Sequence, residues 1–334
     1  MKVYEIRDAF GIDALTLSER PEPTPGPGQV FVKTRAFSVN FRDLLVVKGD
    51  YSRKLPLPMT PCSDCAGEVA AVGEGVTRVK VGDRVAGIFM QTWIDGEVTE
   101  AKAKSALGGA IGGVLSESVL LHENGLVHFP AHLSFEEAAT LPCAGVTAWH
   151  ALVVEGGVKA GDTVVTLGSG GVSIFALQFA RLKGARVIAT SGSDQKLQRL
   201  LQMGASDGIN YMTTPDWDKR VRELTGAGAD HIVEVGGAAT LPKSFKAVRM
   251  GGRISLIGNV SGHGEVNPVP LLMKNVRMQG IFVGSREMFE SMNQTIEASG
   301  MRPVVDRVFP FDQAREAMHY MESGAHFGKI CIRV

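Results

Sequence analysis

This sequence contains, near its middle, the stretch Thr163-Val-Val-Thr-Leu-Gly-Ser-Gly-Gly-Val-Ser173. Its first residues are mostly β-branched and predict a strand, and the glycines that follow predict a tight turn. The turn opens an amphipathic segment from Val172 to Lys183, and Gly184 ends that segment. A second apolar strand follows at Ala185–Thr190. This order of strand, turn, helix and strand predicts a βαβ unit.

The glycines of this turn indicate a site for a dinucleotide. Gly168 permits the tight turn, and Gly170 lets the backbone approach a pyrophosphate. Gly171 and Val172 belong to the same predicted site, where the helix offers unpaired N–H groups and its positive dipole end to the phosphates. The third glycine of the Gly-x-Gly-x-x-Gly pattern of Rossmann folds is here Ser173, so the motif alone also fits a βαβ unit without a ligand.

Two strands further along the chain favour the binding interpretation. His231–Val235 and Arg253–Ile257 are short, largely apolar runs, and each is followed by a glycine. Gly236 and Gly258 would then line the crevice at the carboxyl edge of a parallel sheet, where dinucleotides bind. We therefore predict an α/β fold with a doubly wound parallel sheet of the Rossmann type.

The end of the second strand indicates which dinucleotide binds. NAD sites usually place Asp or Glu there to hold the ribose 2′-hydroxyl. Here Ser191 stands at the strand end, and we interpret Ser193-Asp194 as the cap of the next helix. Small donors and Lys196 would accept a 2′-phosphate, so NADP(H) is the predicted cofactor. Alternatively, Lys196 is an ordinary solvated helix residue.

Length and composition limit the remaining function classes. The 334 residues suffice for two domains with substantial cores. The formal net charge is zero and no basic block is present, so we expect neither a nucleic-acid partner nor a membrane partner. No apolar run approaches ~18 residues and no signal-peptide pattern is visible, which predicts a soluble, cytoplasmic protein. Four cysteines argue against a disulfide framework.

The sequence pattern changes along the chain. The N-terminal part is rich in short β segments and turns, and alternating runs such as Gln29–Thr34 suggest the half-buried strands of a small barrel or sandwich. A capping box, Ser134-Phe-Glu-Glu137, begins a helical stretch. The small residues of Ala103–Gly113 predict a surface loop. A strand at Lys329–Val334 closes the sequence.

Three landmarks outside the βαβ unit resemble the medium-chain dehydrogenase/reductase superfamily. They are Gly67-Glu-Val-Ala-Ala-Val-Gly73, Val81-Gly-Asp-Arg-Val85 and Phe327-Gly-Lys-Ile-Cys-Ile-Arg-Val334. The resemblance implies a β-rich GroES-like catalytic domain over residues 1–130, completed by residues 287–334. It also implies a Rossmann cofactor domain over residues 131–286, and a homodimer with edge pairing near Arg253–Ile257.

The metal-ligand positions depart from those of the zinc enzymes in this superfamily. By the resemblance, these positions fall on Asn40, on Cys62-Ser63-Asp64 and on Cys143. An amide and a hydroxyl are poor zinc ligands, because zinc prefers thiolate, imidazole or carboxylate. We therefore expect no metal.

The Cys62-x-x-Cys65 spacing occurs in zinc sites and in redox pairs. No second pair or nearby histidine completes a metal set, so we interpret both residues as small buried cysteines. A makeshift metal site from one of them with Cys143 and Asp64 is the alternative.

The pattern around Asn40 resembles the zinc-independent quinone oxidoreductase and enoyl reductase branch. Asn40-x-x-Asp43 is followed by Gly49-Asp-Tyr51. In that branch the asparagine lies in the active cleft, and a tyrosine after a similar glycine donates a proton. The resemblance thus implies catalytic roles for Asn40 and Tyr51. Alternatively, Tyr51 is an ordinary rim residue and Asp43 is a structural acceptor.

Further cofactor contacts follow from resemblance. Thr147 aligns with a position near the nicotinamide, and Tyr211 aligns with a tyrosine near the 2′-phosphate. Lys329 is a further expected contact to phosphate. Independently of the resemblance, we expect Phe282 to be an aromatic that faces the cofactor or the substrate. The alternatives are a helix residue bonded to its own backbone for Thr147, a strand-end aromatic for Tyr211, a packing residue for Phe282 and a solvated surface residue for Lys329.

The predicted activity follows from the expected lack of zinc. Without a Lewis acid, oxidation of ordinary alcohols is disfavoured. We predict an NADP(H)-dependent oxidoreductase that transfers a hydride to a quinone or an α,β-unsaturated carbonyl compound, a small electrophilic acceptor. Asn40 and backbone donors would stabilise the enolate oxygen, and Tyr51 or water would deliver the proton. The alternatives are an NAD(P)-dependent alcohol dehydrogenase of the same superfamily and a non-catalytic NADPH-binding protein.

Overall fold

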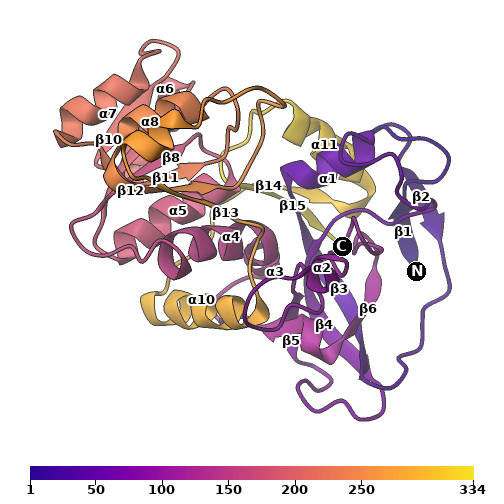
Figure 1. Cartoon of the computed structure of the whole chain (residues 1–334). Coiled ribbons are helices and arrows are strands. Elements are labelled where there is room, and N and C mark those ends of the chain that lie inside the picture. Colours follow the sequence, from indigo (N-terminus) through magenta and orange to yellow (C-terminus); the bar gives the residue numbers. More distant parts are fainter. The chain divides into compact units, whose positions relative to one another are not determined.

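The computed structural model describes residues 1–334, which divide into two compact units (Figure 1). The first unit comprises Met1–Val146 and Val283–Val334, and the second comprises Thr147–Phe282. The first unit thus extends beyond the expected boundary at residue 130. The reason is helix α3 (Phe135–Ala139), which packs against strands of the first unit.

The second unit contains a six-stranded parallel sheet. Its strands, in spatial order, are β10 (Asp207–Asn210), β9 (Arg186–Ser191), β8 (Thr163–Leu167), β11 (Ala229–Glu234), β12 (Val248–Leu256) and β13 (Arg277–Gly280). Numbered within this unit, the order is 3-2-1-4-5-6, that of the Rossmann fold. The predicted doubly wound α/β fold is therefore confirmed, and its switch point lies between β8 and β11.

The helices of this unit pack against the sheet and enclose its core. They are α5 (Gly171–Leu182), α6 (Asp194–Gln202), α7 (Trp217–Thr225), α8 (Leu241–Ala247) and α9 (Val269–Met273). The α5 helix contacts β8 and β9, whereas α7 and α8 pack on each other and on β11. Val165, Ile188 and Ile232 of the central strands lie in one buried cluster with Phe245 of α8. Burial of such β-branched strand residues on both faces is typical of parallel sheets.

Short α4 (Val146–Trp149) lies between two π-helical turns, Leu141–Gly145 and His150–Val154. Runs of π-helix are rare and occur often at functional sites. Thr147, expected near the nicotinamide, is buried within α4.

The first unit contains a two-stranded ribbon and a seven-stranded sheet. The ribbon pairs β1 (Lys2–Glu5) with β2 (Thr16–Glu19). The sheet has the order β14 (Val305–Pro310), β15 (Lys329–Arg333), β3 (Gln29–Val39), β4 (Asp64–Val72), β5 (Arg84–Gly87) and β7 (Leu126–His128), and β6 (Ser118–His122) also pairs with β3. Since β15 lies between β14 and β3, the C-terminal residues complete this unit, as the resemblance implies. The GroES-like fold is confirmed.

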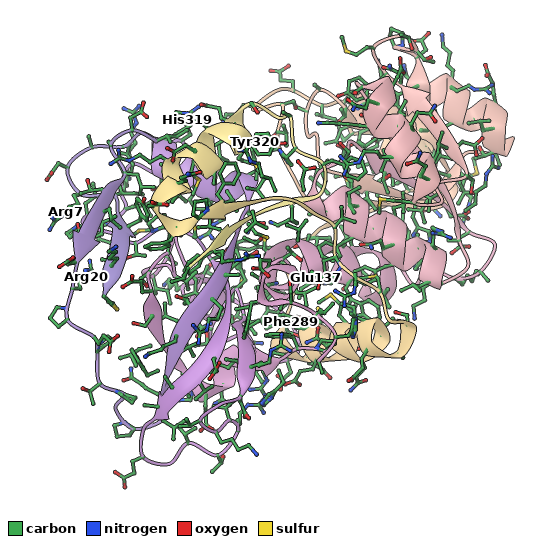
Figure 2. All side chains as sticks on the ribbon, turned by 180° about the vertical axis from the view of Figure 1, so that it is seen from behind. Arg7, Arg20, Glu137, Phe289, His319 and Tyr320 are labelled. Carbon is green, nitrogen blue, oxygen red and sulfur yellow. The ribbon has the colours of Figure 1, made fainter.

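The helices of the first unit include α1 (Phe41–Lys48), α2 (Glu100–Ala103), α10 (Arg286–Ser299) and α11 (Ala314–Glu322). The predicted capping box at α3 is present. The Ser134 hydroxyl accepts the Glu137 N–H at 3.2 Å, and the Glu137 carboxylate accepts the Ser134 N–H at 2.8 Å. Arg302 also donates to this carboxylate at 2.9 Å (Figure 2 labels Glu137). None of the helices has the length and apolarity that a membrane span requires.

The small-residue segment Ala103–Gly113 is only in part the predicted surface loop, because Ala110–Gly112 is exposed whereas Ser105–Gly109 is buried. A Cβ on Gly108 would lie 2.6 Å from the Cys62 carbonyl oxygen, and one on Gly113 would lie 2.3 Å from it. These glycines allow close packing around Cys62, whose φ of 69° is itself in the left-handed region. The segment therefore supports the backbone beside Ser63.

The strand that was expected to pair in a homodimer does not lie at an edge of the sheet. Arg253–Ile257 falls largely in β12, which pairs with β11 on one side and β13 on the other. It therefore has no open edge. The edge strand on this side of the sheet is β13, and all four of its residues are exposed.

Candidate active site

The glycine loop, Gly168–Gly171, lies between β8 and α5. Gly168 has a φ of 77°, which explains the need for glycine there. Gly170 is the N-cap residue of α5 and has no side chain that could accept a hydrogen bond. The first N–H groups of α5 are therefore not capped by a side chain. A Cβ on Gly168 or Gly170 would meet no atom within 4 Å. This open space over unpaired N–H groups fits the pyrophosphate of a dinucleotide.

Ser173 replaces the third glycine of the motif without disturbing the loop. It is buried, and its hydroxyl donates to the Leu167 carbonyl oxygen at 2.6 Å. The side chain thus ties the first turn of α5 to the end of β8. Ser173 gives this loop a strand-to-helix bond that a glycine lacks.

The residues expected at the 2′-phosphate lie together at the carboxyl end of β9. Tyr211 donates its N–H to the Ser191 carbonyl oxygen at 3.1 Å. A Cβ on Gly192 would lie 2.8 Å from the Tyr211 hydroxyl, so the phenol lies over the turn that follows Ser191. Lys196 is in the first turn of α6, where its N–H donates to the Ser193 hydroxyl at 3.4 Å.

Asp194 does not take the place of a ribose-binding carboxylate at the strand end. It is the first residue of α6, Ser193 is the N-cap, and Asn210 donates to the Asp194 carboxylate at 2.7 Å. The interpretation of Ser193-Asp194 as a helix cap is confirmed. The predicted preference for NADP(H) depends on this position of Asp194, because a carboxylate at the strand end would instead favour the ribose 2′-hydroxyl of NAD.

Glu234 shapes the crevice at β11, and our sequence analysis missed it. The fully buried carboxylate accepts the N–H of Gly236 at 2.8 Å and that of Gly237 at 3.2 Å. It also accepts hydrogen bonds from the hydroxyls of Thr240, at 2.6 Å, and Ser244. One side chain therefore orders the whole turn between β11 and α8. The signal was a carboxylate at the end of the apolar run His231–Val235, where a charge is costly unless it is paired.

A cavity of about 370 Å³ lies at the carboxyl ends of β11 and β12, where the crevice was expected. Gly237 and Gly258 line it, whereas Gly236 does not. Glycine is required at Gly258 because a Cβ there would lie 2.4 Å from the Val235 carbonyl oxygen. The other aromatic expected near the cofactor, Phe282, is 42% exposed at the end of this unit.

In the first unit, a buried polar network surrounds Asn40. Lys329 on β15 donates from its ammonium to the Val39 carbonyl oxygen at 2.8 Å and to Asn40 Oδ1 at 2.5 Å. Asn40 in turn donates from Nδ2 to Asp64 Oδ2 at 2.9 Å. The Asp64 carboxylate also accepts the hydroxyls of Ser63 at 2.7 Å and Ser38 at 3.3 Å. These five residues, Lys329, Asn40, Asp64, Ser63 and Ser38, are called the Lys329 cluster.

Lys329 is therefore not a solvated surface residue, since only 4% of it is exposed. Neither Val39 nor Asn40 is a carboxylate, so the ammonium has hydrogen bonds but no ion pair. Burial raises the pKa of Asp64, whereas the Lys329 ammonium and the bonds from Asn40, Ser63 and Ser38 oppose that rise. The cluster is thus a separated pair of buried charges with an amide between them.

Asp43 lies next to this cluster at the start of α1. Its carboxylate accepts the Asn40 N–H at 2.8 Å, which supports the structural interpretation of this residue. Burial raises the pKa of Asp43 to about 6, and the neighbouring Arg42 guanidinium opposes the rise. Its second oxygen, Oδ1, is buried without a hydrogen-bond partner.

Tyr51, the expected proton donor, is separate from these bonds. It is 45% exposed, and the Arg42 guanidinium lies over its ring at 5.3 Å from the centroid. The Arg42 guanidinium also lies 4.6 Å from the centroid of the Phe89 ring, and it donates to the Leu107 carbonyl oxygen at 2.8 Å. Arg42 thus orients the phenol at a solvent-exposed rim. The catalytic role of Tyr51 stays a prediction.

The residues at the metal-ligand positions do not fit zinc. Asn40 and Ser63 supply an amide and a hydroxyl, and both are engaged within the Lys329 cluster. Burial raises the pKa of the Cys143 thiol well above its usual range, an effect that Asp64 increases. The makeshift site is not formed either, because no three His, Cys, Asp or Glu side chains are grouped to hold a metal. The Cys62 and Cys65 thiols are buried and free, as expected.

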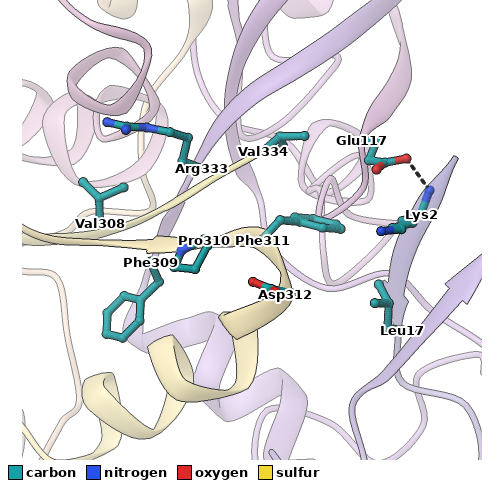
Figure 3. Close-up of a pocket in the computed structure, with 10 residues that line it drawn as sticks. All are labelled: Lys2, Leu17, Glu117, Val308, Phe309, Pro310, Phe311, Asp312, Arg333 and Val334. Atoms are coloured by element: carbon teal, nitrogen blue, oxygen red, sulfur yellow. Dashed lines mark hydrogen bonds between the residues drawn. The ribbon is translucent and has the colours of Figure 1, made fainter.

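A second cavity, of about 490 Å³, lies in the first unit among β1, β2, β14 and β15 (Figure 3). Figure 3 shows Lys2 donating its N–H to the Glu117 carboxylate, at 2.6 Å. None of the predicted site residues lines this cavity.

Two family profiles match this sequence. Residues 26–131 match the family described as alcohol dehydrogenase GroES-like domain, and residues 171–298 match that described as zinc-binding dehydrogenase. A zinc-type alcohol dehydrogenase-like protein of Schizosaccharomyces pombe is 45% identical, with 99% of each chain covered. The quinone oxidoreductase of Homo sapiens is 29% identical, with 95% of this chain and 92% of that protein covered.

Solved structures give the same picture of the fold. A candidate alcohol dehydrogenase of Sinorhizobium meliloti has a TM-score of 0.93 at 44% identity, covering 100% of this chain and 98% of its own. An NAD-dependent alcohol dehydrogenase has a TM-score of 0.91 at 36% identity, with full coverage of both chains. A mycobacterial protein complexed with NADPH has a TM-score of 0.84 at 27% identity, also with full coverage. Similar structures are thus described with NAD in one case and with NADPH in another.

Proposed function

Because this chain belongs to the medium-chain dehydrogenase/reductase superfamily and is an oxidoreductase, we propose that it is a zinc-independent, NADPH-dependent reductase of quinones or α,β-unsaturated carbonyl compounds. The single observation that carries the proposal is the Lys329 cluster. At the positions where related enzymes bind zinc, this chain has an amide and a hydroxyl bound into a network with a buried ammonium. Such a site suits an acceptor that is already electron-poor.

The residues of the second unit suit a bound NADPH. The glycine loop and the first turn of α5 would hold the pyrophosphate, and Ser191, Lys196 and Tyr211 would hold the 2′-phosphate. Gly258 and Phe282 would lie toward the nicotinamide half, together with Thr147. When bound, the dihydronicotinamide supplies a hydride to the acceptor.

The names of the relatives favour a second candidate, an alcohol dehydrogenase. The relative from Schizosaccharomyces pombe is named a zinc-type alcohol dehydrogenase-like protein, and one similar structure is that of an NAD-dependent alcohol dehydrogenase. The two candidates differ in the direction of the reaction and in the acceptor. An alcohol dehydrogenase of this superfamily would also need a group that activates the alcohol hydroxyl. The Lys329 cluster does not provide a set of side chains that could hold a metal for this purpose.

The test is a comparison of the two reactions at equal protein concentration. We expect NADPH oxidation with a panel of quinones and enones, and little reduction of NAD⁺ or NADP⁺ by primary and secondary alcohols. Faster alcohol oxidation, dependent on added zinc, would favour the second candidate. Tight NADPH binding with no turnover of any acceptor would favour a binding protein.

We also propose a homodimer that pairs through β13. This strand is an exposed edge, and the neighbouring apolar residues Leu272 and Met273 are 80% and 69% exposed. Exposed sheet edges with apolar neighbours are typical pairing sites. Light scattering should give the mass of two chains, and Leu272→Glu should give one. A wild-type mass of one chain would contradict the proposal.

A further inference from the structure

Lys329 is a buried cation with hydrogen-bonding capacity to spare. An ammonium carries three N–H donors. Two of them bind the Val39 carbonyl oxygen and Asn40 Oδ1, and no protein acceptor is present for the third. Since burial of a charge is costly when its bonding is incomplete, the third donor indicates a place for a ligand oxygen.

The surroundings of Lys329 keep its positive charge available. Its nearest hydrogen-bonded carboxylate neighbour in the network, Asp64, is bound to Asn40 and not to the ammonium. A direct buried ion pair would neutralise the charge of Lys329. Such a pair often adds no more stability than apolar side chains at the same positions would. The amide of Asn40 instead fixes the ammonium while it separates the two charges. This arrangement suits a site that stabilises a negative oxygen.

Asn40 is less suited to that role than the sequence suggested. Its Oδ1 accepts from Lys329, and one N–H of Nδ2 is used by Asp64. Only one weakly acidic N–H is left for a substrate. Asn40 and Asp64 therefore act on Lys329, as positioning residues that set the direction of its ammonium.

We propose that the third N–H of Lys329 donates to the carbonyl oxygen of the acceptor and stabilises the enolate that forms there. This rests on the proposed function. In the reduction of an enone, a hydride with its electron pair adds to the β-carbon and forms a C–H bond. The electrons of the C=C bond form the enolate double bond, and the carbonyl electrons move to oxygen. The acceptor is thereby reduced at the expense of the cofactor.

Lys329 keeps its proton in this step, because a hydrogen bond is sufficient to stabilise the oxyanion. The α-carbon then takes a proton from Tyr51 or from water, which restores the carbonyl group. Each enone thus gains one hydride and one proton. Lys329 would be a catalytic residue that no zinc ligand pattern reveals.

The test uses p-nitrophenol, whose coloured phenolate imitates the enolate oxygen without turnover. We compare wild type with Lys329→Met, both loaded with NADP⁺. We expect the bound ligand to be phenolate in the wild type, and its affinity to fall about tenfold or more in K329M. The affinity for p-nitroanisole, which has no ionisable oxygen, should be unchanged.

Lys274 provides the matched control. Its ammonium is also partly buried and bonds backbone carbonyl oxygens, among them those of Phe245 and Lys246 at 2.8 Å, but it lies outside the Lys329 cluster. Lys274→Met should leave phenolate binding unchanged. If K329M does not fold, Lys329→Gln keeps an N–H donor without the charge and should show the same loss of phenolate binding.

The outcomes separate this inference from the proposed function. In K329M, we expect kcat for enone reduction to fall about a hundredfold while the Kd of NADPH changes little. Equal phenolate affinity in wild type and K329M overturns the inference, as does an equal loss of NADPH affinity, which would make Lys329 a phosphate contact. If the wild type reduces no acceptor but binds phenolate through Lys329, the proposed function fails and the oxyanion site stands.

Discussion

The glycine loop of the second unit and the Lys329 cluster of the first are built in opposite ways. The glycine loop is one continuous stretch, and in the proposed complex its backbone N–H groups would hold the pyrophosphate. The Lys329 cluster joins side chains from distant parts of the chain, with Asn40 and Lys329 separated by 289 positions. The first kind of site depends on the absence of side chains, whereas the second depends on three side chains bonding in series. Their sensitivities to substitution should therefore differ.

The largest effect should come from filling the glycine loop. Gly170 has extended dihedral angles that a valine can adopt, and its Cβ would enter the space over the N–H groups of α5. We expect Gly170→Val to raise the Kd of NADPH by about a hundredfold or more, since it blocks the pyrophosphate. Fluorescence titration measures the affinity. Gly112→Val, at another glycine with open space, should leave it unchanged, and equal effects of the two would contradict this account.

Glu234 shows that the neighbouring turn between β11 and α8 depends on a side chain. Glu234→Ala leaves the N–H groups of Gly236 and Gly237 and two hydroxyls without their acceptor. We expect a loss of about 3 kcal/mol in the free energy of unfolding, together with weaker NADPH binding. Urea unfolding measures the first. Glu234→Gln keeps one acceptor oxygen and should lose about 1 kcal/mol; a loss as large as that of E234A would disprove the hydrogen-bond explanation.

Selectivity between the two cofactors should depend on Lys196. We expect Lys196→Ala to raise the Kd of NADPH about fivefold, through the loss of a charge-assisted bond, and to leave that of NADH unchanged. Lys219→Ala removes an exposed lysine of α7 and serves as the control. A parallel change for NADPH and NADH would mean that Lys196 does not contact the 2′-phosphate.

The smallest effect concerns Asp43 and appears as a dependence of stability on pH. Its pKa is raised from 3.8 to about 6 in the folded state, mainly by burial. The folded protein therefore holds this proton more tightly, and stability decreases as the pH rises from about 4 to about 6. Asp43→Asn cannot ionise and still accepts the Asn40 N–H.

Between pH 4 and pH 7, the free energy of unfolding of the wild type should therefore fall relative to that of D43N by on the order of 2 kcal/mol. Asp64 is present in both proteins, so its own titration largely cancels. Urea unfolding at several pH values measures the shift. A difference that is independent of pH would show that Asp43 ionises normally.

The difference between the glycine loop and the Lys329 cluster also explains which features could be predicted from the sequence. The glycine loop, the order of strands and the cap at Ser193 follow from local patterns, because turns, helix caps and periodicity depend on neighbouring residues. The placement of Lys329 does not. The sequence suggested a contact to phosphate or a solvated residue, and only the pairing of β15 with β3 brings Lys329 to Asn40.

Other differences have the same origin. Ala103–Gly113 has the composition of a loop, but two of its glycines, Gly108 and Gly113, allow close contact with Cys62. The strand at Arg253–Ile257 lies inside the sheet because β13, a short strand of mixed polarity, adds a further edge. Glu234 was visible in its strand, but its four hydrogen-bond donors come from the turn and helix that follow. Contacts between distant segments thus account for what sequence patterns missed.

We propose that a buried ammonium, and no zinc ion, serves the active site of this oxidoreductase. The most direct test is the metal content of protein produced with abundant zinc, measured together with NADPH-dependent reduction of an enone before and after chelation. We predict far less than one zinc per chain and an activity that chelation does not change. One zinc per chain, with activity that chelation abolishes and zinc restores, would contradict the claim.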